Sequence, residues 1–273
     1  MPVFETPDPV AIRISSPAGL VVVEAWDDPR VDVDVTPLGG DDGSRQAADE
    51  TRVEATDRSG RHQIVIEVPK REGRFGFLGR SPELRITIRC PEGTDVELST
   101  HSADFEARGT LGEVEVRSAS GDASLDDARA LGFSTASGDL SAGRVHGPLT
   151  SKGASGDVDV RFVAGRAQVG TVSGDVRLGR TDGVVNVKAV SGDVDLESIG
   201  ADVRVSAVSG DVSIAARPGL ALWIDAQSVS GTMQSDLDVG HPPEAGSDDP
   251  QVELKVQTVS GDVRISRATM PVL

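Results

Sequence analysis

Acidic residues recur through the second half of the chain at positions where several carboxylates could act together. The tripeptide Ser-Gly-Asp occurs seven times between residues 120 and 262, and an eighth copy reads Ser-Gly-Thr. If the aspartates faced solvent at the same place in a repeated unit, they would form an acidic strip that attracts a divalent cation or a basic partner. Six of them follow one another at intervals of 17 or 18 residues: Asp122, Asp139, Asp157, Asp175, Asp193 and Asp211.

Other features of the same repeats favour a structural role for these aspartates. The glycine-rich nonapeptide of calcium-binding β-rolls is absent, and a neighbouring column reads Asp159, Arg177, Asp195, which indicates cross-strand charge pairing. Asp and Ser also accept hydrogen bonds from the free amides of a tight turn. We interpret the tripeptide as turn chemistry, keep a cation-binding strip as the alternative, and predict no metal ligands.

The remaining residues with catalytic or metal-binding chemistry are scattered. His62, His101, His146 and His241 form no cluster with ligand spacing, which argues against zinc. The single cysteine, Cys90, allows no intrachain disulfide, and we interpret it as a buried or strand-end thiol. No nucleophile elbow or phosphate loop is present. A catalytic carboxylate pair should occur once rather than in every repeat, so we predict no catalytic residues, no cofactor and no enzyme activity.

One glycine-rich segment, residues 70–80, is basic in an otherwise acidic chain. It could contact an anionic membrane or an acidic protein. The alternative is a connection between strands whose phenylalanines pack against its neighbours. The candidate contact residues are Lys70, Arg71, Arg74, Phe75, Phe77 and Arg80.

The spacing of the repeat glycines predicts the elements that position these residues. In chain order the glycines are separated by 17, 18, 18, 18, 18, 21 and 30 residues, which indicates one structural unit stacked on itself. Because glycine permits a positive φ or a close backbone approach, we place a corner of the chain at each one. The eight corner glycines are Gly121, Gly138, Gly156, Gly174, Gly192, Gly210, Gly231 and Gly261.

Apolar residues alternate with polar ones on both sides of each corner. With the glycine as position zero, positions −7, −5, +2 and +4 are mostly apolar, as in Val185, Val187, Val194 and Leu196 around Gly192. A period of two indicates two short, half-buried strands in each unit. Position −3 is always small, which suits a narrow edge where two walls converge.

A unit of 18 residues suits one coil of a single-stranded β-solenoid, or β-helix, in which each strand pairs with its copy one coil away, about 4.8 Å distant. One coil buries apolar side chains worth on the order of 6–12 kcal/mol. Ordering its backbone costs roughly 20 kcal/mol or more. A single coil therefore cannot fold alone, whereas a stack can, and we predict an all-β fold with an irregular β-rich N-terminal cap.

Composition restricts the partners. The formal net charge is −17, which argues against nucleic acid, and the absence of Tyr argues against stacking platforms for bases or sugars. No apolar run has the length of a membrane span, and the first residues lack the basic and apolar regions of a signal peptide. We therefore expect a cytoplasmic protein that touches a membrane only through residues 70–80.

We divide the chain into residues 1–100, a β-rich cap with degenerate first coils, and residues 101–273, a regular solenoid. The second part contains an acidic loop at 236–250 and a C-terminal cap from Arg264 to Leu273. A short helix is expected at residues 44–50, with Asp42 or Ser44 as its N-cap. The strands expected in the first part are Val10–Ser15, Leu20–Ala25, Val31–Val35, Thr51–Ala55, Gln63–Val68 and Leu84–Arg89.

Several stretches of residues 1–267 resemble the actinobacterial putative-adhesin β-strand-repeat family, a domain of unknown function. The resemblance implies a β-solenoid and supplies no catalytic residues. Thr232 in place of Asp and the late 30-residue spacing depart from the pattern. The matching stretches are Met1-Pro2-x-Phe4-x-Thr6-Pro7-x-Pro9, the basic loop with Leu84-Arg85-Ile86-Thr87-Ile88, the Ser-Gly-Asp-Val units, and Ala221-Leu222-Trp223-Ile224-Asp225.

These observations predict a non-enzymatic β-solenoid that acts as a scaffold or protein-interaction module. Its expected partner is a protein or a second copy of the chain. Two alternatives remain open at this point: a surface or envelope-stress protein resembling an adhesin, and an acidic rod that binds cations.

Overall fold

The computed structural model describes residues 3–5, 10–58, 61–69, 81–237 and 251–268. Apart from one helix, its regular elements are strands, and most of these pair in parallel as a β-solenoid, which confirms the predicted fold class. The chain divides into two compact units, residues 1–142 and 143–273. The boundary predicted after residue 100 lies inside strand β7 (Asp95–Arg117), and the division into a cap and a regular solenoid stays a prediction.

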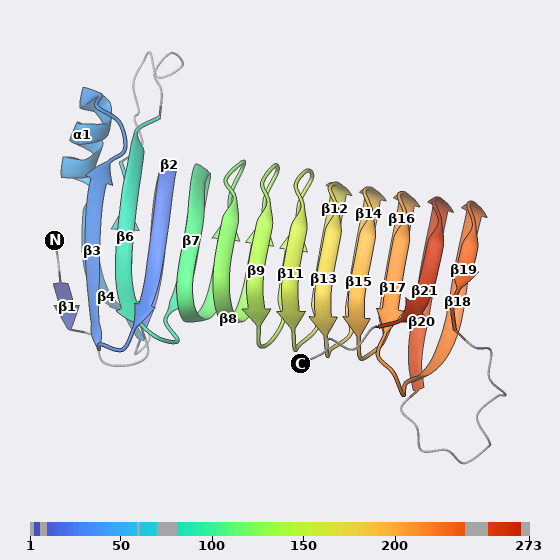
Figure 1. Cartoon of the computed structure of the whole chain (residues 1–273). Coiled ribbons are helices and arrows are strands. Elements are labelled where there is room, and N and C mark those ends of the chain that lie inside the picture. The colour runs from blue at the N-terminus through green and yellow to red at the C-terminus, as the bar shows by residue number, and fades with distance from the viewer. Residues whose placement is uncertain (1–2, 6–9, 59–60, 70–80, 238–250, 269–273) are drawn as a thin grey trace. The chain divides into compact units, whose positions relative to one another are not determined.

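Unit 1 is built on two long strands, β2 (Val10–Trp26) and β7, which pair in parallel from Ala11↔Asp95 to Glu24↔Arg108. β5 (Arg61–Glu67) pairs in parallel with the first part of β2, and β6 (Glu83–Pro91) with the second. β8 (Ala123–Ser134) continues the parallel stack on β7. Figure 1 shows these strands in blue to green.

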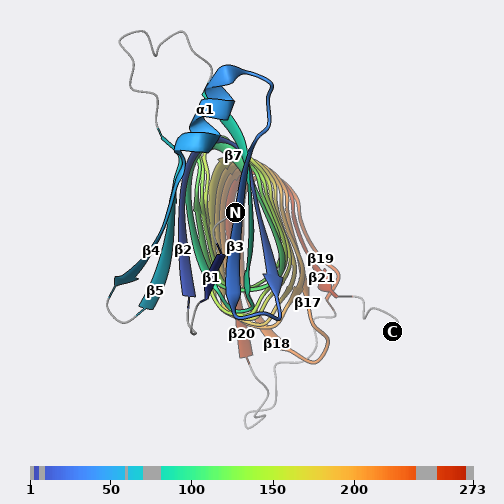
Figure 2. The same ribbon diagram turned by 90° about the vertical axis from the view of Figure 1, so that its left-hand side faces the viewer.

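Antiparallel strands and the helix complete unit 1. β1 (Val3–Glu5) pairs with β3 (Arg30–Pro37), and β3 pairs with β6. β4 (Arg52–Arg58) forms a hairpin with β5. Helix α1 (Asp42–Glu50) contacts β3 and β6, and Figure 2 shows it above these strands with the β4–β5 hairpin to one side. This end of the unit is therefore covered by elements that do not repeat the coil.

The helix begins at Asp42, two residues earlier than expected. Asp41, rather than Asp42 or Ser44, is the N-cap, because its Oδ2 accepts a hydrogen bond from the Ser44 amide at 2.8 Å. The hydroxyl of Ser44 serves a different contact, since it accepts the amide of Glu83 at 3.1 Å. Ser44 thereby ties the helix to the start of β6.

The two strands expected at Val10–Ser15 and Leu20–Ala25 form one continuous strand, β2. The backbone changes direction within it at Gly19, which has a φ of 113°. A Cβ at this position would overlap with the backbone of Leu84, so only glycine permits the close approach of β6. The other four expected strands are present as β3, β4, β5 and β6 with ends shifted by a few residues.

Unit 2 contains two parallel ladders, one on each side of the repeat corner. β9 (Leu140–Val145) crosses the boundary between the units. In spatial order the first ladder is β10 (Leu149–Lys152), β12 (Ala167–Ser173), β14 (Val185–Ser191), β16 (Val203–Ser209), β20 (Gln251–Ser260) and β18 (Ala221–Ser230). The second ladder is β11 (Val158–Val163), β13 (Val176–Thr181), β15 (Val194–Ile199), β17 (Val212–Ala216), β21 (Val263–Arg267) and β19 (Met233–Ser235).

The last coil in the sequence is not the last coil in space. β20 and β21 pair with β16 and β17 on one side and with β18 and β19 on the other. Figure 1 shows the red β20–β21 coil between its neighbours, with the orange β18–β19 coil outside it. The expectation that Arg264 begins a C-terminal cap is wrong, because Arg264 lies within the inner strand β21. Residues 269–273 lie outside the described part of the chain.

The apolar side chains predicted to face inward are buried in the inner coils of unit 2. Val185, Val187, Val194 and Leu196 are at most 1% exposed. A further buried row lies at position +7, for example Thr181 and Ile199, which pair in register. Strict alternation does not predict this row, because the step between buried residues changes from two to three within these strands, as from Leu196 to Ile199.

Candidate functional site

The aspartates of the repeat join consecutive coils through their side chains. In unit 2 the Oδ1 of Asp157, Asp175, Asp193 and Asp211 accepts the amide of the aspartate in the next coil at 2.8 Å. In unit 1, Asp122 accepts the Asp139 amide at 2.9 Å in the same way. The carboxylate thus supplies an acceptor at the corner, where the backbone ladder turns. This geometry shows the aspartates acting in the corner, and an additional role as an acidic strip stays a prediction.

The corner glycines allow the coils to approach closely. Gly156, Gly174, Gly192, Gly210, Gly231 and Gly261 have φ between 122° and 156°. A Cβ on Gly192 would overlap with the carbonyl oxygen of Gly174 in the preceding coil. Gly121 and Gly138 lack this positive φ, but a Cβ on either would meet a backbone oxygen as closely. Two separate constraints therefore require glycine at the corners of unit 2.

The single departure from the tripeptide, Thr232, lies in the outermost coil of unit 2. Its amide donates to Asp262 Oδ1 at 2.7 Å, so it is the last donor of the aspartate series. Within the described residues no coil follows β18–β19, and an aspartate at position 232 would have no amide of a further coil to accept. The missing aspartate therefore marks the end of the stack.

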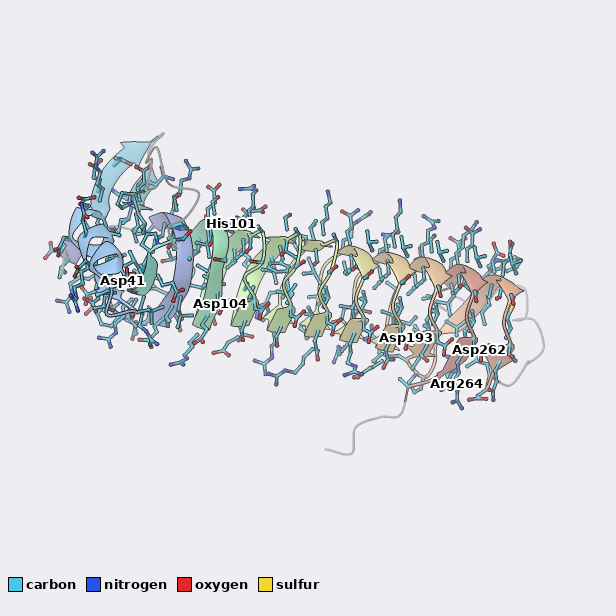
Figure 3. The ribbon with its side chains drawn as sticks, turned by 90° about the horizontal axis from the view of Figure 1, so that it is seen from above. Asp41, His101, Asp104, Asp193, Asp262 and Arg264 are labelled. Carbon is cyan, nitrogen blue, oxygen red and sulfur yellow. The ribbon has the colours of Figure 1, made fainter. Side chains whose placement is uncertain are left out.

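The carboxylates also form an exposed acidic surface on unit 2. Asp157, Asp175, Asp193, Asp211 and Asp262 are all exposed, and we call them the aspartate column. Asp193 and Asp262 are labelled along one side of this unit in Figure 3. No group of three or more His, Cys, Asp or Glu side chains in the described part of the chain is placed to hold a metal ion. The column therefore presents negative charge in a row without forming a cage around a cation.

A column of exposed valines runs beside the aspartates. Position −2 of five coils is valine, and the neighbouring residues of these strands pair in register, so the side chains stack from coil to coil. They are 43–83% exposed, although valine is ordinarily a core residue. We call these residues the valine column; in spatial order they are Val172, Val190, Val208, Val259 and Val229.

The valine and aspartate columns lie at the two ends of the same corner. In four of the five coils the sequence reads Val-Ser-Gly-Asp, as in Val190-Ser191-Gly192-Asp193, and in the fifth Thr232 replaces the aspartate. The repeat therefore creates an apolar row flanked by an acidic row. The valines were not predicted, because the inward positions alone define the strand pattern, although valine recurs at position −2 in the alignment of the repeats.

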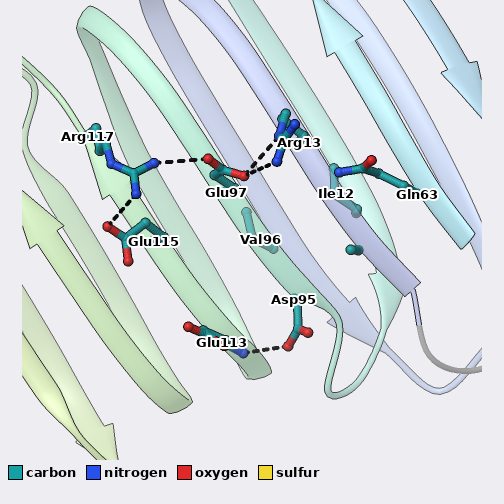
Figure 4. A pocket seen from close by; sticks show the side chains of 10 residues that line it. Ile12, Arg13, Gln63, Asp95, Val96, Glu97, Glu113, Glu115 and Arg117 are labelled. Carbon is teal, nitrogen blue, oxygen red and sulfur yellow. Dashed lines mark hydrogen bonds and ion pairs between the residues drawn. The ribbon is translucent and has the colours of Figure 1, made fainter. Parts of the chain in front are cut away.

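A shallow hollow of about 430 Å³ lies on unit 1 and is lined by residues of β2, β5 and β7. Glu97 accepts ion pairs from Arg13 at 2.8 Å and from Arg117 at 2.9 Å, and Arg117 also contacts Glu115 at 3.1 Å (Figure 4). Burial raises the pKa of Glu97, but hydrogen bonds and charges from Arg13 and Arg117 outweigh it and hold the pKa below its ordinary value. An alternating network of this kind stabilises neighbouring strands and provides no carboxylate poised as a general base.

His101 and Cys90 have structural roles. His101 contributes its carbonyl oxygen, which accepts the amides of Ala119 and Ser120 at 3.1 and 3.0 Å. Cys90 is fully buried, and burial raises its pKa to about 12 against the opposing hydrogen bond with Thr94. A thiol with this pKa is almost entirely protonated at neutral pH and is a poor nucleophile.

The candidate interaction loop cannot be placed. Lys70, Arg71, Arg74, Phe75, Phe77 and Arg80 all lie outside the described residues. The predicted membrane contact through this loop therefore stays a prediction. Across the segments that the structure describes, no helix has the length and apolar character needed to span a bilayer.

The fold and these surfaces define a repeat protein of the parallel β-solenoid class. The chain belongs to the Toastrack DUF4097 family, whose model matches residues 12–266. No curated protein matches the chain.

Solved structures of similar architecture come from bacteria. A "putative adhesin" from Parabacteroides distasonis is 12% identical, with a TM-score of 0.50 over 97% of this chain and 95% of that chain. A "putative adhesin" from Bacteroides fragilis is 13% identical, with a TM-score of 0.45 over 96% of this chain and 95% of that chain. The Parabacteroides structure shows a shared fold.

Proposed function

We propose that this chain is a non-enzymatic β-solenoid that serves as a protein-interaction scaffold and binds its partner along the valine column. The observation that carries the proposal is the register of five exposed valines on consecutive coils. Contiguous apolar surface of this kind is uncommon on soluble monomers and marks interaction sites. The same register makes the surface regular, so a regular element of the partner can follow it.

The spacing and charge of the two columns specify that element. Successive valines are about 4.8 Å apart, the distance between neighbouring strands. This is close to the 5.4 Å pitch of an α-helix, so a helix lying along the column places one apolar side chain near each valine. The aspartate column favours lysine or arginine on one flank of that helix. The expected partner is a protein with a basic amphipathic helix.

A photo-crosslinking amino acid at Val208 of the full chain, expressed in its native cells, tests this proposal. We expect a covalent adduct with one distinct protein, and a synthetic peptide of that protein's basic helix should bind the purified chain more weakly as salt is raised. Introducing Val172→Lys and Val190→Lys should abolish the adduct. The matched control, Gln168→Lys with Ser206→Lys, adds the same charge to the same ladder at exposed positions outside the column and should retain it.

Absence of an adduct would contradict the proposal, and so would an adduct that survives the valine substitutions. An adduct with a protein lacking a basic helix would contradict the proposed partner.

An adhesin-like role at the cell surface is the second candidate, because the Parabacteroides structure with this fold is named a putative adhesin. We favour the cytoplasm, since a lone buried thiol suits a reducing compartment. Cell fractionation separates the two. Recovery in the soluble cytoplasmic fraction supports the scaffold, whereas recovery at the cell surface supports the adhesin-like role and contradicts the cytoplasmic one.

A further inference from the structure

The outermost coil of unit 2 leaves two strands with neighbours on only one side. We call β18 and β19 together the edge coil. β18 pairs with β20 and β19 with β21, and among the residues that the structure describes no strand pairs with their outer sides. The backbone of β18, ten residues long, therefore presents amide and carbonyl groups along an open edge.

The edge coil lacks the usual protection of an exposed edge. Such strands commonly carry lysine, proline or a bulge that prevents pairing with another chain. β18 contains no lysine, arginine or proline, and its single charge, Asp225, is paired with Lys255 of β20 at 3.6 Å. Two of its exposed side chains are large and apolar: Trp223 is 61% exposed and Val229 is 83% exposed. This combination is typical of a strand that is covered in its working state.

We propose that a second copy of this chain covers the edge coil, and that the two β18 strands pair antiparallel about a two-fold axis through Ala226. A two-fold axis normal to the ladder keeps the inward side of each coil inward and reverses the strand direction. Isologous contacts of this kind close at two subunits. The pairing gives hydrogen-bond partners to the open amide and carbonyl groups of β18 in both copies, so neither copy keeps this strand as an exposed edge.

The register follows from the alternation of side chains. Opposed residues of an antiparallel pair point to the same side, so the axis must pass through a residue rather than between two. With the axis at Ala226, Asp225 lies opposite Gln227 of the second copy, and the two can hydrogen-bond. Trp223, the most exposed aromatic residue of the coil, lies opposite Val229 of the second copy.

The neighbouring register is unfavourable. An axis through Asp225 would place the two Asp225 carboxylates opposite each other, and like charges directly opposed on a sheet are destabilising. The same axis would set Trp223 against Gln227 rather than against an apolar side chain. The axis through Ala226 therefore pairs the charged Asp225 with a hydrogen-bonding partner and pairs the apolar Trp223 with another apolar side chain.

This dimer goes beyond the scaffold function and does not depend on the partner proposed for the valine column. Val172 and Val190 lie on β12 and β14, which are inner strands of the ladder, whereas the dimer contact lies on β18. The lysine substitutions at Val172 and Val190 should leave self-association unchanged. The two proposals can therefore fail separately.

Disulfide trapping in the full chain tests the register. In Trp223→Cys with Val229→Cys, mild oxidation should give a crosslinked dimer, because the two positions face each other across the axis. The matched control, Trp223→Cys with Gln227→Cys, would crosslink only in the Asp225-centred register and should stay uncrosslinked. Each single variant should also stay uncrosslinked, since Trp223 and its own copy are about 20 Å apart along the strands. A crosslink in the control instead of the test pair would overturn the register.

Sedimentation of the unmodified chain over a concentration series tests the dimer itself. We expect a monomer–dimer equilibrium that Val229→Lys weakens by roughly tenfold or more, since each dimer loses two contacts with Trp223. Val229 is almost fully exposed in the single chain, so this variant should fold. A strict monomer at every concentration would overturn the proposal. So would a Val229→Lys variant that is monomeric and less stable, because that result would indicate that another segment of the same chain covers the edge coil.

Discussion

The inner coil β14–β15 and the edge coil β18–β19 carry versions of the same repeat, yet their environments differ. Val185 and Val187 of β14 are at most 1% exposed, whereas Ile224, which occupies the position of Val185, is 39% exposed. The inner coil is hydrogen-bonded on both sides, and the edge coil, within the described residues, on one. Position in the stack therefore decides what a repeat residue contributes.

The same comparison explains the tripeptide. The side chain of Asp193 accepts the Asp211 amide of the following coil, whereas among the described residues no amide of a further coil donates to the side chain of Thr232, whose own amide donates to Asp262. An aspartate is needed where another coil follows, and the edge coil needs none. The motif is therefore a connection between coils rather than a property of each coil.

The largest expected effect comes from the corner glycines. Gly192→Ala forces a side chain at a φ of 132° and against the Gly174 carbonyl, which should lower the free energy of unfolding by about 3 kcal/mol or more. Gly231→Ala should cost less, because the edge coil can shift outward. Gly170→Ala, where a Cβ meets nothing within 4 Å, is the control and should cost less than about 1 kcal/mol. Chemical denaturation of the three variants measures the order, and equal losses at Gly192 and Gly231 would contradict the distinction between inner and edge coils.

A smaller difference in the free energy of unfolding should separate core substitutions in the inner strand β16 from those in the edge strand β18. Val203→Ala removes two methyl groups from a fully buried site and should cost about 2 kcal/mol. Ile224→Ala removes more atoms, but from a side chain that is 39% exposed, and should cost less than about 1 kcal/mol in the monomer. Thermal or urea unfolding at low protein concentration gives both values. An Ile224→Ala variant that is less stable than Val203→Ala would contradict the difference between inner and edge coils.

The smallest effect concerns the aspartate connection. Asp193→Ala removes the acceptor of the Asp211 amide and should cost about 1 kcal/mol. Asp193→Asn keeps a side-chain oxygen that can accept the same hydrogen bond and should cost less. Thr232→Ala leaves its amide bond to Asp262 in place and should be nearly neutral. Urea unfolding of all three variants checks this order, and a loss for Thr232→Ala as large as that for Asp193→Ala would contradict the role of the aspartate as a connection to the following coil.

Much of the coil was predictable from sequence because its residues repeat. Alternation around Gly192 places Val185, Val187, Val194 and Leu196 inside without any knowledge of the fold. The row represented by Ile199 was not predicted, because the step between buried residues changes from two to three within the strand, after Leu196, and no residue type in the repeat marks that change. Local pattern thus predicts burial only as far as the strand remains regular.

The order of the coils was not predictable from the repeat alone. A parallel strand can stack on either side of an earlier coil, so the pattern of Val252–Val256 does not reveal that β20 enters between β16 and β18. Thr232 and the 30-residue spacing carried the missing information, since they mark the coil that nothing follows. The valine column was equally visible at position −2, but its exposure became meaningful only once the corner had a geometry.

Amide hydrogen exchange of β14 and β18 over a dilution series tests the central claim most directly, because it compares an inner and an edge strand in one molecule. We predict slow exchange in β14 at all concentrations. β18 should exchange fast in dilute protein and more slowly as concentration rises and a second copy covers it. Equally slow exchange of β14 and β18 at every dilution, or fast exchange of β18 that concentration does not change, would contradict the account.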